Sequence, residues 1–329
     1  MPDMKRKYQL LKGLLSGEQA FSGPMYVCVD ITRRCNLRCT GCFSHGLGEK
    51  KYVPGNHAVL DVPFPLVERV MKELRMLGTR KVSLSGEGEP LLHPRIFDII
   101  ASCKREDMQV QLFTNGTLLH ESAIHSLLRS GVDIVKVSLW GSTPEEYALC
   151  HKGVETSAFG EILASLSTLS RLKKTLGTKK PLVYLNHVLT RTTYEGIGRK
   201  VELALETGCN GVLFHPFIAW NSHVSEEELA PEQIRRLCGD LIRVQKRMAS
   251  LALYSNVDDA LLHYRLGKSA YTSIPCYTGW YQARIRVDGA VMPCVRCHET
   301  LGDLSDSSFE SIWNGEQYRL FRRKCSGRE

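Results

Sequence analysis

The amino-acid sequence predicts an α/β fold built on a mostly parallel sheet, and three observations lead to this prediction. Six short apolar runs rich in β-branched residues alternate with segments of helical spacing, the pattern that arises when helical crossovers join parallel strands. Polar and glycine-rich motifs follow these runs, at the strand ends where such sheets place their sites. The composition becomes turn-rich near Thr272, which indicates a small second domain. Six strand–helix units suit either a partial barrel or an open doubly wound sheet.

The expected elements follow one another along the chain without an internal repeat. A short N-terminal helix ends before the turn at residues 22–24. Apolar, β-branched runs predict strands over residues 25–31, 81–85, 109–114, 134–139, 182–189 and 211–217. Helical spacing predicts helices over residues 64–77, 94–104, 120–129, 159–176, 194–207 and 231–253. Gly78 and Gly208 close two of these helices, and Pro94 suits the first turn of another.

The composition is that of a soluble globular protein, with 43% hydrophobic and 24% charged residues among 329. It excludes disorder, collagen and coiled coil as the main state of the chain. No apolar run is long enough to cross a membrane, and the basic N-terminus lacks the apolar core of a signal peptide. We therefore expect a cytoplasmic protein without a membrane partner.

The charge is basic overall, at +8 from 43 lysines and arginines against 35 aspartates and glutamates. The basic residues are scattered, which is typical of a solvated surface, and an anionic substrate is the alternative interpretation. Nucleic acid is not expected as a partner, because no basic helix is interleaved with aromatic residues.

Twelve cysteines are unusual for a chain of this kind, and clustered cysteines in a reducing compartment bind metal more often than they form disulfides. Cys35, Cys39 and Cys42 lie in a loop after the first expected strand. Thiolates are suited to iron–sulfur clusters and to zinc. Three local ligands leave one iron of a cubane cluster open, as a catalytic site requires. A zinc knuckle with a distant fourth ligand is the structural alternative.

These three cysteines match the CxxxCxxC signature, and from about residue 26 to residue 217 the chain resembles the radical S-adenosylmethionine (SAM) enzymes. The resemblance implies a partial (β/α)6 TIM-type barrel and a SAM-binding 4Fe-4S cluster. It also implies reductive cleavage of SAM to a 5′-deoxyadenosyl radical, which abstracts hydrogen from a substrate. The family usually has an aromatic residue before the third cysteine, near the adenine. Gly41 stands there in this chain, and Phe43 is the expected substitute.

Further motifs extend the resemblance to SAM contacts. Residues Gly88, Glu89 and Pro90 match the family's GGEP motif for the SAM amino group, with Glu87 in place of the first glycine. The other expected SAM-contact residues are Ser138, Lys152 in the place of a family arginine, and Asn186. Alternation along the strand puts Asn186 and His187 on opposite faces, so at most one of the two faces the cavity. His215 is a further candidate there, and the Thr114-Asn115-Gly116 turn is expected to be architectural.

The C-terminal segment resembles the SPASM/twitch extension of radical SAM enzymes. Its marks are Cys276, Gly289 five positions before Cys294, and the segments 301–304 and 309–315. Asp288-Gly289 between two β-like runs predicts a hairpin there. The resemblance implies one auxiliary 4Fe-4S cluster, and a zinc ribbon is the alternative. The expected ligands of the auxiliary cluster are Cys276, Cys294, Cys297 and Cys325. The remaining cysteines, Cys28, Cys103, Cys150, Cys209 and Cys238, are expected to pack in the core.

The expected organisation is an N-terminal helical extension (1–24), a radical SAM partial barrel (25–271) and a SPASM/twitch-like auxiliary iron–sulfur domain with a β-hairpin and helices (272–329). The leading hypothesis is a radical SAM enzyme acting on a small polar, sugar- or amino-acid-like substrate. The type of reaction is left open among oxidoreductase, lyase and isomerase. The alternatives are modification of a ribosomal peptide or protein side chain, as by SPASM-type maturases, and a non-enzymatic iron–sulfur or zinc-binding module. An electron donor such as flavodoxin or ferredoxin is the expected partner.

Overall fold

A computed structural model describes residues 2–45, 58–219, 222–267, 275–297 and 299–326. The chain divides into two compact units, each assembled from segments that are distant in the sequence. The first unit comprises Met1–Arg34, Pro54–Leu112 and Thr272–Glu329, and the second comprises Cys35–Val53 and Phe113–Tyr271. The CxxxCxxC cysteines therefore belong to the second unit, whereas the Gly88-Glu89-Pro90 motif and the C-terminal cysteines belong to the first.

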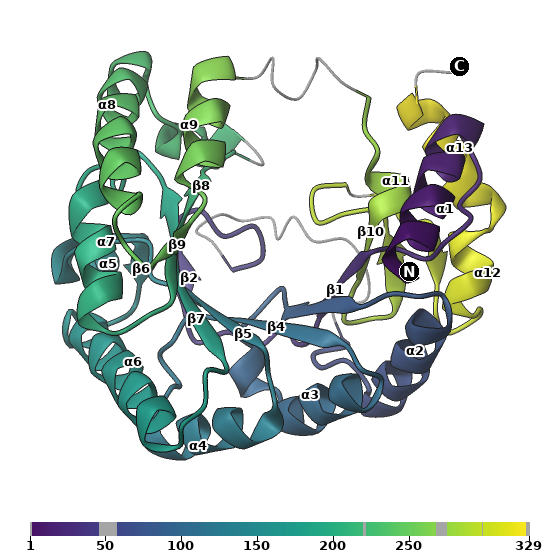
Figure 1. The fold of residues 1–329 in the computed structure, drawn as a ribbon, viewed down its shortest axis with the longest axis horizontal. Helices are drawn as coiled ribbons and strands as arrows, with labels where there is room; N and C mark the ends of the chain where they lie inside the picture. Colours follow the sequence, from purple (N-terminus) through teal and green to yellow (C-terminus); the bar gives the residue numbers. More distant parts are fainter. Residues whose placement is uncertain (1, 46–57, 220–221, 268–274, 298, 327–329) are drawn as a thin grey trace. The chain divides into compact units, whose positions relative to one another are not determined.

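The sheet of the first unit joins barrel strands to the C-terminal hairpin (Figure 1). In sheet order its strands are β12 (Gly302–Asp303), β11 (Ala290–Met292), β10 (Gln282–Ile285), β1 (Tyr26–Asp30), β3 (Lys81–Ser85) and β4 (Gln109–Thr114). Strands β1, β3 and β4 run parallel, and β10 pairs parallel with β1. The hairpin partner β11 and then β12 pair antiparallel. The predicted C-terminal hairpin is confirmed, and it extends the parallel sheet.

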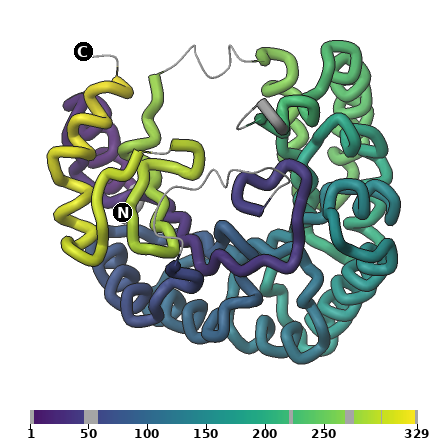
Figure 2. Tube along the Cα trace, turned by 180° about the vertical axis from the view of Figure 1, so that it is seen from behind, coloured from purple at the N-terminus to yellow at the C-terminus, as the bar shows by residue number. Residues whose placement is uncertain are grey.

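Amphipathic helices cover this sheet, and α2 and α3 lie side by side (Figure 1). Helix α2 buries Val67, Val70, Met71 and Leu74, which recur at helical spacing on one stripe. The N-terminal helix α1 lies beside the C-terminal helices (Figure 2), where the buried Arg322 donates to the carbonyl of Gly279. The helices of this unit are α1 (Pro2–Ser16), α2 (Phe64–Met76), η1 (Pro90–Leu92), α3 (Ile96–Arg105), α11 (Thr278–Tyr281), α12 (Phe309–Trp313) and α13 (Glu316–Ser326).

The second unit carries a parallel sheet of four strands and a separate two-stranded ladder. In sheet order the four strands are β5 (Ile134–Ser138), β7 (Leu182–Leu189), β8 (Gly211–Pro216) and β9 (Tyr254–Ser255). The ladder pairs β2 (Arg38–Cys39) with β6 (His151–Lys152). The helices are α4 (Glu121–Ser130), α5 (Pro144–Cys150), α6 (Ser157–Thr175), α7 (Ile197–Glu206), η2 (Ser222–Glu227), α8 (Pro231–Met248) and α9 (Val257–Leu266).

One face of the four-stranded sheet carries polar side chains, and we call Lys136, Ser138, Tyr184, Asn186 and His215 the polar face. Their positions follow from register, because Lys136 pairs with Tyr184, Ser138 with Asn186, and Val188 with His215. Alternate residues of β5 and β7 point the other way and are almost fully buried. The polar face is therefore the side of this sheet available to a ligand.

Most of the expected elements are confirmed within each unit, and three strands (β3, β4 and β7) match residue for residue. Several helix boundaries were wrong, among them the start of helix α7, which begins at Ile197 after the N-cap Gly196 instead of at residue 194. Helix α3 begins at Ile96, because Arg95 is its N-cap and Pro94 lies outside it, and α8 ends at Met248 instead of residue 253. The 271/272 domain boundary lies outside the described residues, so the division into 1–24, 25–271 and 272–329 remains a prediction. Among the described helices, none combines the length and the apolar character needed to cross a membrane.

Candidate functional site

The CxxxCxxC loop is fixed by a short ladder that the sequence did not reveal. Strand β2 pairs antiparallel with β6, so that Cys39 lies opposite His151 and Arg38 opposite the exposed Lys152. The backbone N–H of Thr40 extends this contact by donating to the carbonyl of Cys150 at 2.9 Å. Lys152 is thereby brought beside the cysteine loop from a point more than a hundred residues further along the chain.

A side-chain network holds the residue after the first cysteine. Asn36 donates to the hydroxyl of Thr117 at 2.8 Å and accepts from the amide of Asn115 at 2.9 Å. The Thr117 hydroxyl closes the triangle by donating to the side-chain amide oxygen of Asn115 at 2.7 Å. The Thr114-Asn115-Gly116 turn thus anchors the cysteine loop through Asn36, in line with the architectural role expected from its sequence.

The three thiols of the loop lie close together in a partly buried environment. Burial, and after it the neighbouring thiols of Cys42 and Cys35, raise the pKa of Cys39 well above its usual range. Backbone N–H groups of Leu37 and His45 donate to the sulfurs of Cys35 and Cys42 at 3.4 and 3.3 Å. Such hydrogen bonds to sulfur stabilise thiolates and tune iron–sulfur clusters.

The donor set suits a cluster better than a single metal ion. Among the described residues, no three His, Cys, Asp or Glu side chains surround one point that would hold a single ion. A 4Fe-4S cluster makes a different demand, because each thiolate binds its own iron and the sulfurs need not converge on one atom. Three neighbouring thiols with N–H···S contacts fit that arrangement.

An aromatic ring occupies the space beside Gly41. A Cβ atom built on Gly41 would lie 2.4 Å from the ring of Phe217, which follows strand β8. Any larger residue at position 41 would therefore collide with this ring. Phe43, the expected aromatic substitute, is half-buried in the same loop. Phe217 is a second aromatic neighbour of the loop that sequence reasoning missed, because the contact joins residues far apart in the chain.

The polar face presents Ser138 and Asn186 side by side, since they are paired across β5 and β7. Asn186 is 7% exposed, and its side-chain carbonyl oxygen has no hydrogen-bond partner among the described residues. A buried acceptor of this kind is costly unless a ligand satisfies it. His187 takes the opposite face, where its Nδ1 lies 3.1 Å from the carbonyl of Trp140. The predicted alternation of Asn186 and His187 is thus confirmed.

In the first unit, the Gly88-Glu89-Pro90 segment packs tightly on the chain just before Cys35. A Cβ on Gly88 would lie 2.1 Å from the carbonyl oxygen of Arg34, so only glycine fits there. The N–H of Glu89 donates to that same oxygen at 2.7 Å. The Glu89 carboxylate is 2% exposed and accepts from the N–H of Leu91 at 3.1 Å, which caps helix η1.

The C-terminal cysteines form a second group of neighbouring thiols in the first unit. Burial, followed by the thiol of Cys276 and a hydrogen bond with it, raises the pKa of Cys325 to about 12. Burial, followed by the thiols of Cys294 and Cys276, likewise contributes to raising the pKa of Cys297. The end of helix α13 therefore brings Cys325 near Cys276 and Cys297, although it is the most distant of the four in sequence.

The remaining cysteines are mostly core residues, as expected. Cys28, Cys103, Cys150 and Cys209 are buried, whereas Cys238 on helix α8 is only partly buried. The expectation of core packing is therefore wrong for Cys238, because its position falls beside the buried stripe of the helix at Leu237 and Leu241.

Two family models match the chain. Residues 29–212 match the Radical SAM superfamily, and residues 276–329 match the SPASM iron-sulfur cluster-binding domain. A tungsten-containing aldehyde ferredoxin oxidoreductase cofactor-modifying protein of Pyrococcus furiosus is 23% identical over 90% of this chain and 83% of its own length. An AdoMet-dependent heme synthase of Methanosarcina barkeri is 25% identical over 92% of this chain and 85% of its own. A PqqA peptide cyclase of Gluconobacter oxydans is 25% identical over 92% and 80%.

Solved structures share the fold. SuiB of Streptococcus suis bound to S-adenosylmethionine superposes with a TM-score of 0.71, at 18% identity over 97% of this chain and 71% of that chain. The enzyme anSMEcpe with bound AdoMet gives 0.67, at 20% identity over 91% and 79%. The fold is thus a partial TIM-type barrel with a C-terminal cluster-binding domain, not an open doubly wound sheet. The chain belongs to the radical SAM superfamily, as an enzyme with a 4Fe-4S cluster, bound SAM and a SPASM domain for an auxiliary cluster.

Proposed function

We propose that this enzyme modifies a side chain of a ribosomal peptide or protein. The observation that carries the proposal is the match to a PqqA peptide cyclase over 92% of this chain, together with the SPASM domain at residues 276–329. SuiB, which has the same fold, has also been solved with its precursor peptide SuiA. Other relatives are named for heme synthesis and for cofactor modification, so a small molecule is the second candidate.

In the proposed site, Cys35, Cys39 and Cys42 hold the 4Fe-4S cluster that binds SAM. When bound and reduced, that cluster supplies the electron that cleaves SAM to a radical able to abstract hydrogen. Glu89 and the Gly88 and Pro90 backbone receive the SAM amino group. The remaining SAM contacts are assigned to Phe43, Ser138, Lys152 and Asn186, with Phe217 as an added aromatic neighbour. The unsatisfied oxygen of Asn186 supports this assignment, since a ligand donor would satisfy it.

Lys136 gives the polar face a preference for an acidic substrate group. Its ammonium lies 4.9 Å from the centre of the Phe113 ring, and no carboxylate among the described residues acts on its pKa. Burial lowers the pKa of Lys136, and burial, followed by the charge of Lys136, lowers the pKa of His215 to about 4. A partly desolvated cation beside a neutral histidine is a ready site for a carboxylate. We therefore propose that Lys136 binds the carboxylate of an Asp or Glu side chain of the substrate.

The C-terminal cysteines Cys276, Cys294, Cys297 and Cys325 are proposed to hold the auxiliary 4Fe-4S cluster. Cys297 lies in electrostatic reach of Cys276 and Cys294, and Cys325 in reach of Cys276 and Cys297. Four such thiols would provide one ligand for each iron, a closed set without an open position. A closed cluster is suited to electron transfer, so we assign it to accept or relay an electron during substrate oxidation. A flavodoxin or ferredoxin is proposed as the external electron donor.

Anaerobic turnover tests the proposed substrate class. The enzyme is reconstituted with iron and sulfide, reduced, and incubated with SAM and with peptides encoded beside its gene. We expect 5′-deoxyadenosine to form together with a mass change on one peptide, and Cys39→Ala to abolish both. In Lys136→Met we expect a higher KM for that peptide and unchanged formation of 5′-deoxyadenosine without it. Modification of small polar metabolites alone, with every peptide unchanged, would overturn the peptide proposal in favour of the small-molecule one.

A further inference from the structure

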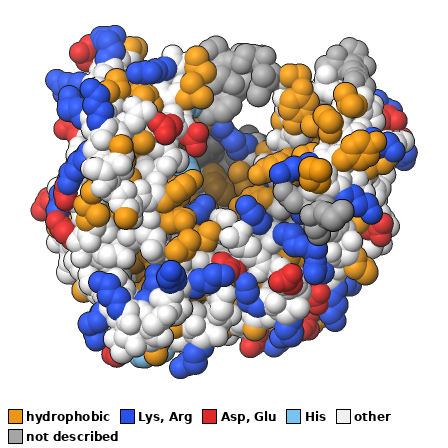
Figure 3. Space-filling view, viewed as in Figure 1, with side chains coloured by type: hydrophobic (Ala, Val, Ile, Leu, Met, Phe, Trp, Pro, Cys, Tyr) orange, Lys and Arg blue, Asp and Glu red, His pale blue; other side chains and the backbone are white. Residues whose placement is uncertain are grey.

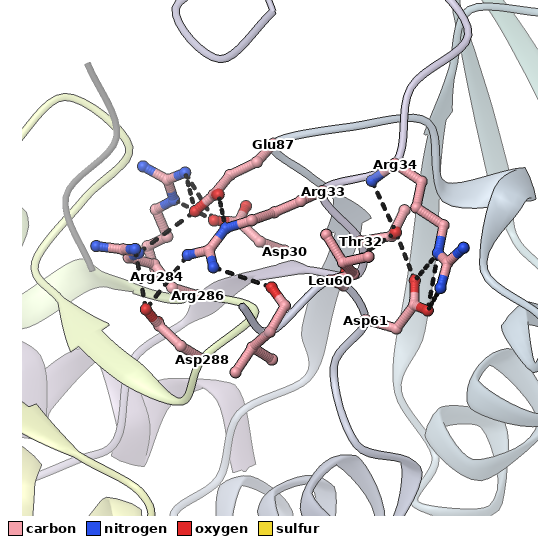
Figure 4. Close-up of polar contacts among 11 residues, drawn as sticks. Asp30, Thr32, Arg33, Arg34, Leu60, Asp61, Glu87, Arg284, Arg286 and Asp288 are labelled. Carbon is pink, nitrogen blue, oxygen red and sulfur yellow. Dashed lines mark hydrogen bonds and ion pairs between the residues drawn. The ribbon is translucent and has the colours of Figure 1, made fainter. Parts of the chain in front are cut away.

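Six buried charged side chains meet at the end of strand β1, and we call them the carboxylate–arginine cluster (Figure 4). Its members are Asp30, Arg33, Glu87, Arg284, Arg286 and Asp288. Their side chains are between 1% and 9% exposed, and three negative charges balance three positive ones. All six belong to the first unit. Neither the proposed cofactor contacts nor the auxiliary cysteines include any of them.

Glu87 is the carboxylate in this cluster that meets all three arginines. Its Oε2 accepts from Nε of Arg33 at 2.5 Å, and its Oε1 lies 3.3 Å from Nε of Arg286 and 4.0 Å from Nη2 of Arg284. Figure 4 shows the Glu87 carboxylate between these guanidinium groups. Glu87 stands where the GGEP pattern has its first glycine, so the anion at the centre of the cluster is a feature of this chain.

The remaining contacts close the cluster on both sides. Asp288, in the turn after β10, lies 3.2 Å from Arg33 and 3.0 Å from Arg286. Asp30 lies 2.6 Å from Arg284 across the parallel β1–β10 pair. Burial alone would lower the pKa of Arg33, but its bonds to Glu87 and Asp288 raise it, so the guanidinium stays charged. Burial raises the pKa of Asp30 to about 6, against the opposing effect of Arg284, so this carboxyl depends on its arginine partner.

Three segments meet in these contacts, and each leads to a different part of the enzyme. Arg33 lies two residues before Cys35, and Glu87 lies two residues before Glu89. Arg284 and Arg286 come from the C-terminal hairpin that precedes Cys294. The Glu89 N–H donates to the carbonyl of Arg34, and a Cβ built on Gly88 would lie 2.1 Å from that oxygen, so two of these segments are in tight contact.

We infer that Glu87 is a positioning residue that couples the C-terminal hairpin to SAM binding. The carboxylate of Glu87 holds the Gly88–Glu89 segment against the chain that leads into the CxxxCxxC loop, and Arg286 ties both to strand β10. Removing one partner of a buried pair leaves an uncompensated charge, so the segment relaxes when either end of the contact is lost. This inference rests on the proposed role of Glu89 toward the SAM amino group, and it is independent of the substrate class.

A double-mutant cycle on SAM affinity tests the coupling without turnover. Glu87→Gln keeps the volume and removes the charge, and Arg286→Gln removes the partner in the hairpin. The dissociation constant for SAM is measured by equilibrium dialysis on anaerobically reconstituted protein, with iron content and melting temperature as checks. The electron paramagnetic resonance spectrum of the reduced cluster is recorded with and without SAM. We expect each single variant to weaken SAM binding about tenfold, and the double variant to weaken it by much less than the product of the two.

Two further variants make the result decisive. Asp98→Asn removes an exposed ion pair with Arg95 in the same unit and is expected to leave SAM affinity unchanged. Arg286→Lys keeps the charge but lacks the planar guanidinium, and it replaces Arg286→Gln if that variant does not fold. We expect Arg286→Lys to weaken SAM binding about threefold. Wild-type affinity in folded, iron-loaded Glu87→Gln and Arg286 variants would overturn the inference and leave the cluster a purely structural role. Additive effects of the two changes would show that Glu87 acts without the hairpin. Failure of the wild type itself to bind SAM would instead contradict the proposed site.

Discussion

At the scale of single residues, the Phe217 ring leaves no room for a side chain at Gly41 in the cysteine loop. A methyl group at position 41 would lie 2.4 Å from the ring, closer than packed atoms can approach. We expect Gly41→Ala to lower the free energy of unfolding by about 1–3 kcal/mol, as overpacking does elsewhere. In a Phe217→Ala background the same change should cost almost nothing, because the ring is gone. Urea unfolding of the four proteins measures the difference.

Gly160 provides the matched control for this cycle. It lies in helix α6, and a Cβ built there meets nothing within 4 Å. We expect Gly160→Ala to be neutral or slightly stabilising, since alanine has the higher helix propensity. An equal loss of stability in Gly41→Ala with and without the Phe217 ring would show that the ring does not limit position 41.

His187 is held in its neutral form, and this has a consequence for stability at low pH. Burial, and then the charge of Lys200, lower the pKa of His187 to about 3. The group therefore stabilises the folded protein above its ordinary pKa of about 6.5, and this contribution is lost as the pH falls toward the folded pKa. Each pH unit below about 6 costs up to about 1.4 kcal/mol through this one group.

We expect His187→Gln, whose amide can still donate to the carbonyl of Trp140, to flatten the loss of stability between pH 6 and pH 4. Chemical denaturation at several pH values measures the slope, and the two proteins should differ by about one bound proton. Parallel curves would mean that His187 is already protonated in the folded state.

At the scale of secondary-structure elements, the β2–β6 ladder is what fixes the second cysteine. The Thr40 N–H donates to the carbonyl of Cys150, whereas the Thr40 hydroxyl is buried without a partner among the described residues. Thr40→Pro removes the N–H, and Thr40→Ala keeps it. We therefore expect Thr40→Pro to lose the irons of the first cluster, about four per chain, while the auxiliary cluster is retained. Iron analysis and electron paramagnetic resonance distinguish the two clusters, and Thr40→Ala should load like the wild type.

The elements also show which parts of the site were predictable. Strands such as β7 were predicted residue for residue, because β-branched runs with flanking turns are a strong local signal. Helix α5, of 7 residues, and strand β6, of 2, are too short for periodicity to reveal, yet they bring Lys152 to the cysteine loop. The sequence could place Lys152 there only through its resemblance to a family.

At the scale of the whole molecule, contacts between residues far apart in the chain are what the sequence could not predict. Asp30 and Arg284 are 254 positions apart and meet because β10 joins the parallel sheet beside β1. No local pattern predicts that a C-terminal hairpin adds to a barrel strand, so the carboxylate–arginine cluster could not be foreseen. The cysteine ligand sets, in contrast, were predicted as groups, because their spacing is itself the chemical signal.

The net charge of +8 leads to a last prediction, about the electron donor. Lysine and arginine side chains are spread over the face drawn in Figure 3 and do not form one patch. A positively charged enzyme attracts an acidic flavodoxin over long distances, and dissolved salt screens this attraction. We expect the rate constant for cluster reduction by such a flavodoxin to fall about tenfold between low and high salt. Stopped-flow absorbance measures this rate, and photoreduction by an uncharged deazaflavin is the control that salt should leave unchanged. A rate that is flat with both donors would mean that docking rests on local contacts instead of the overall charge.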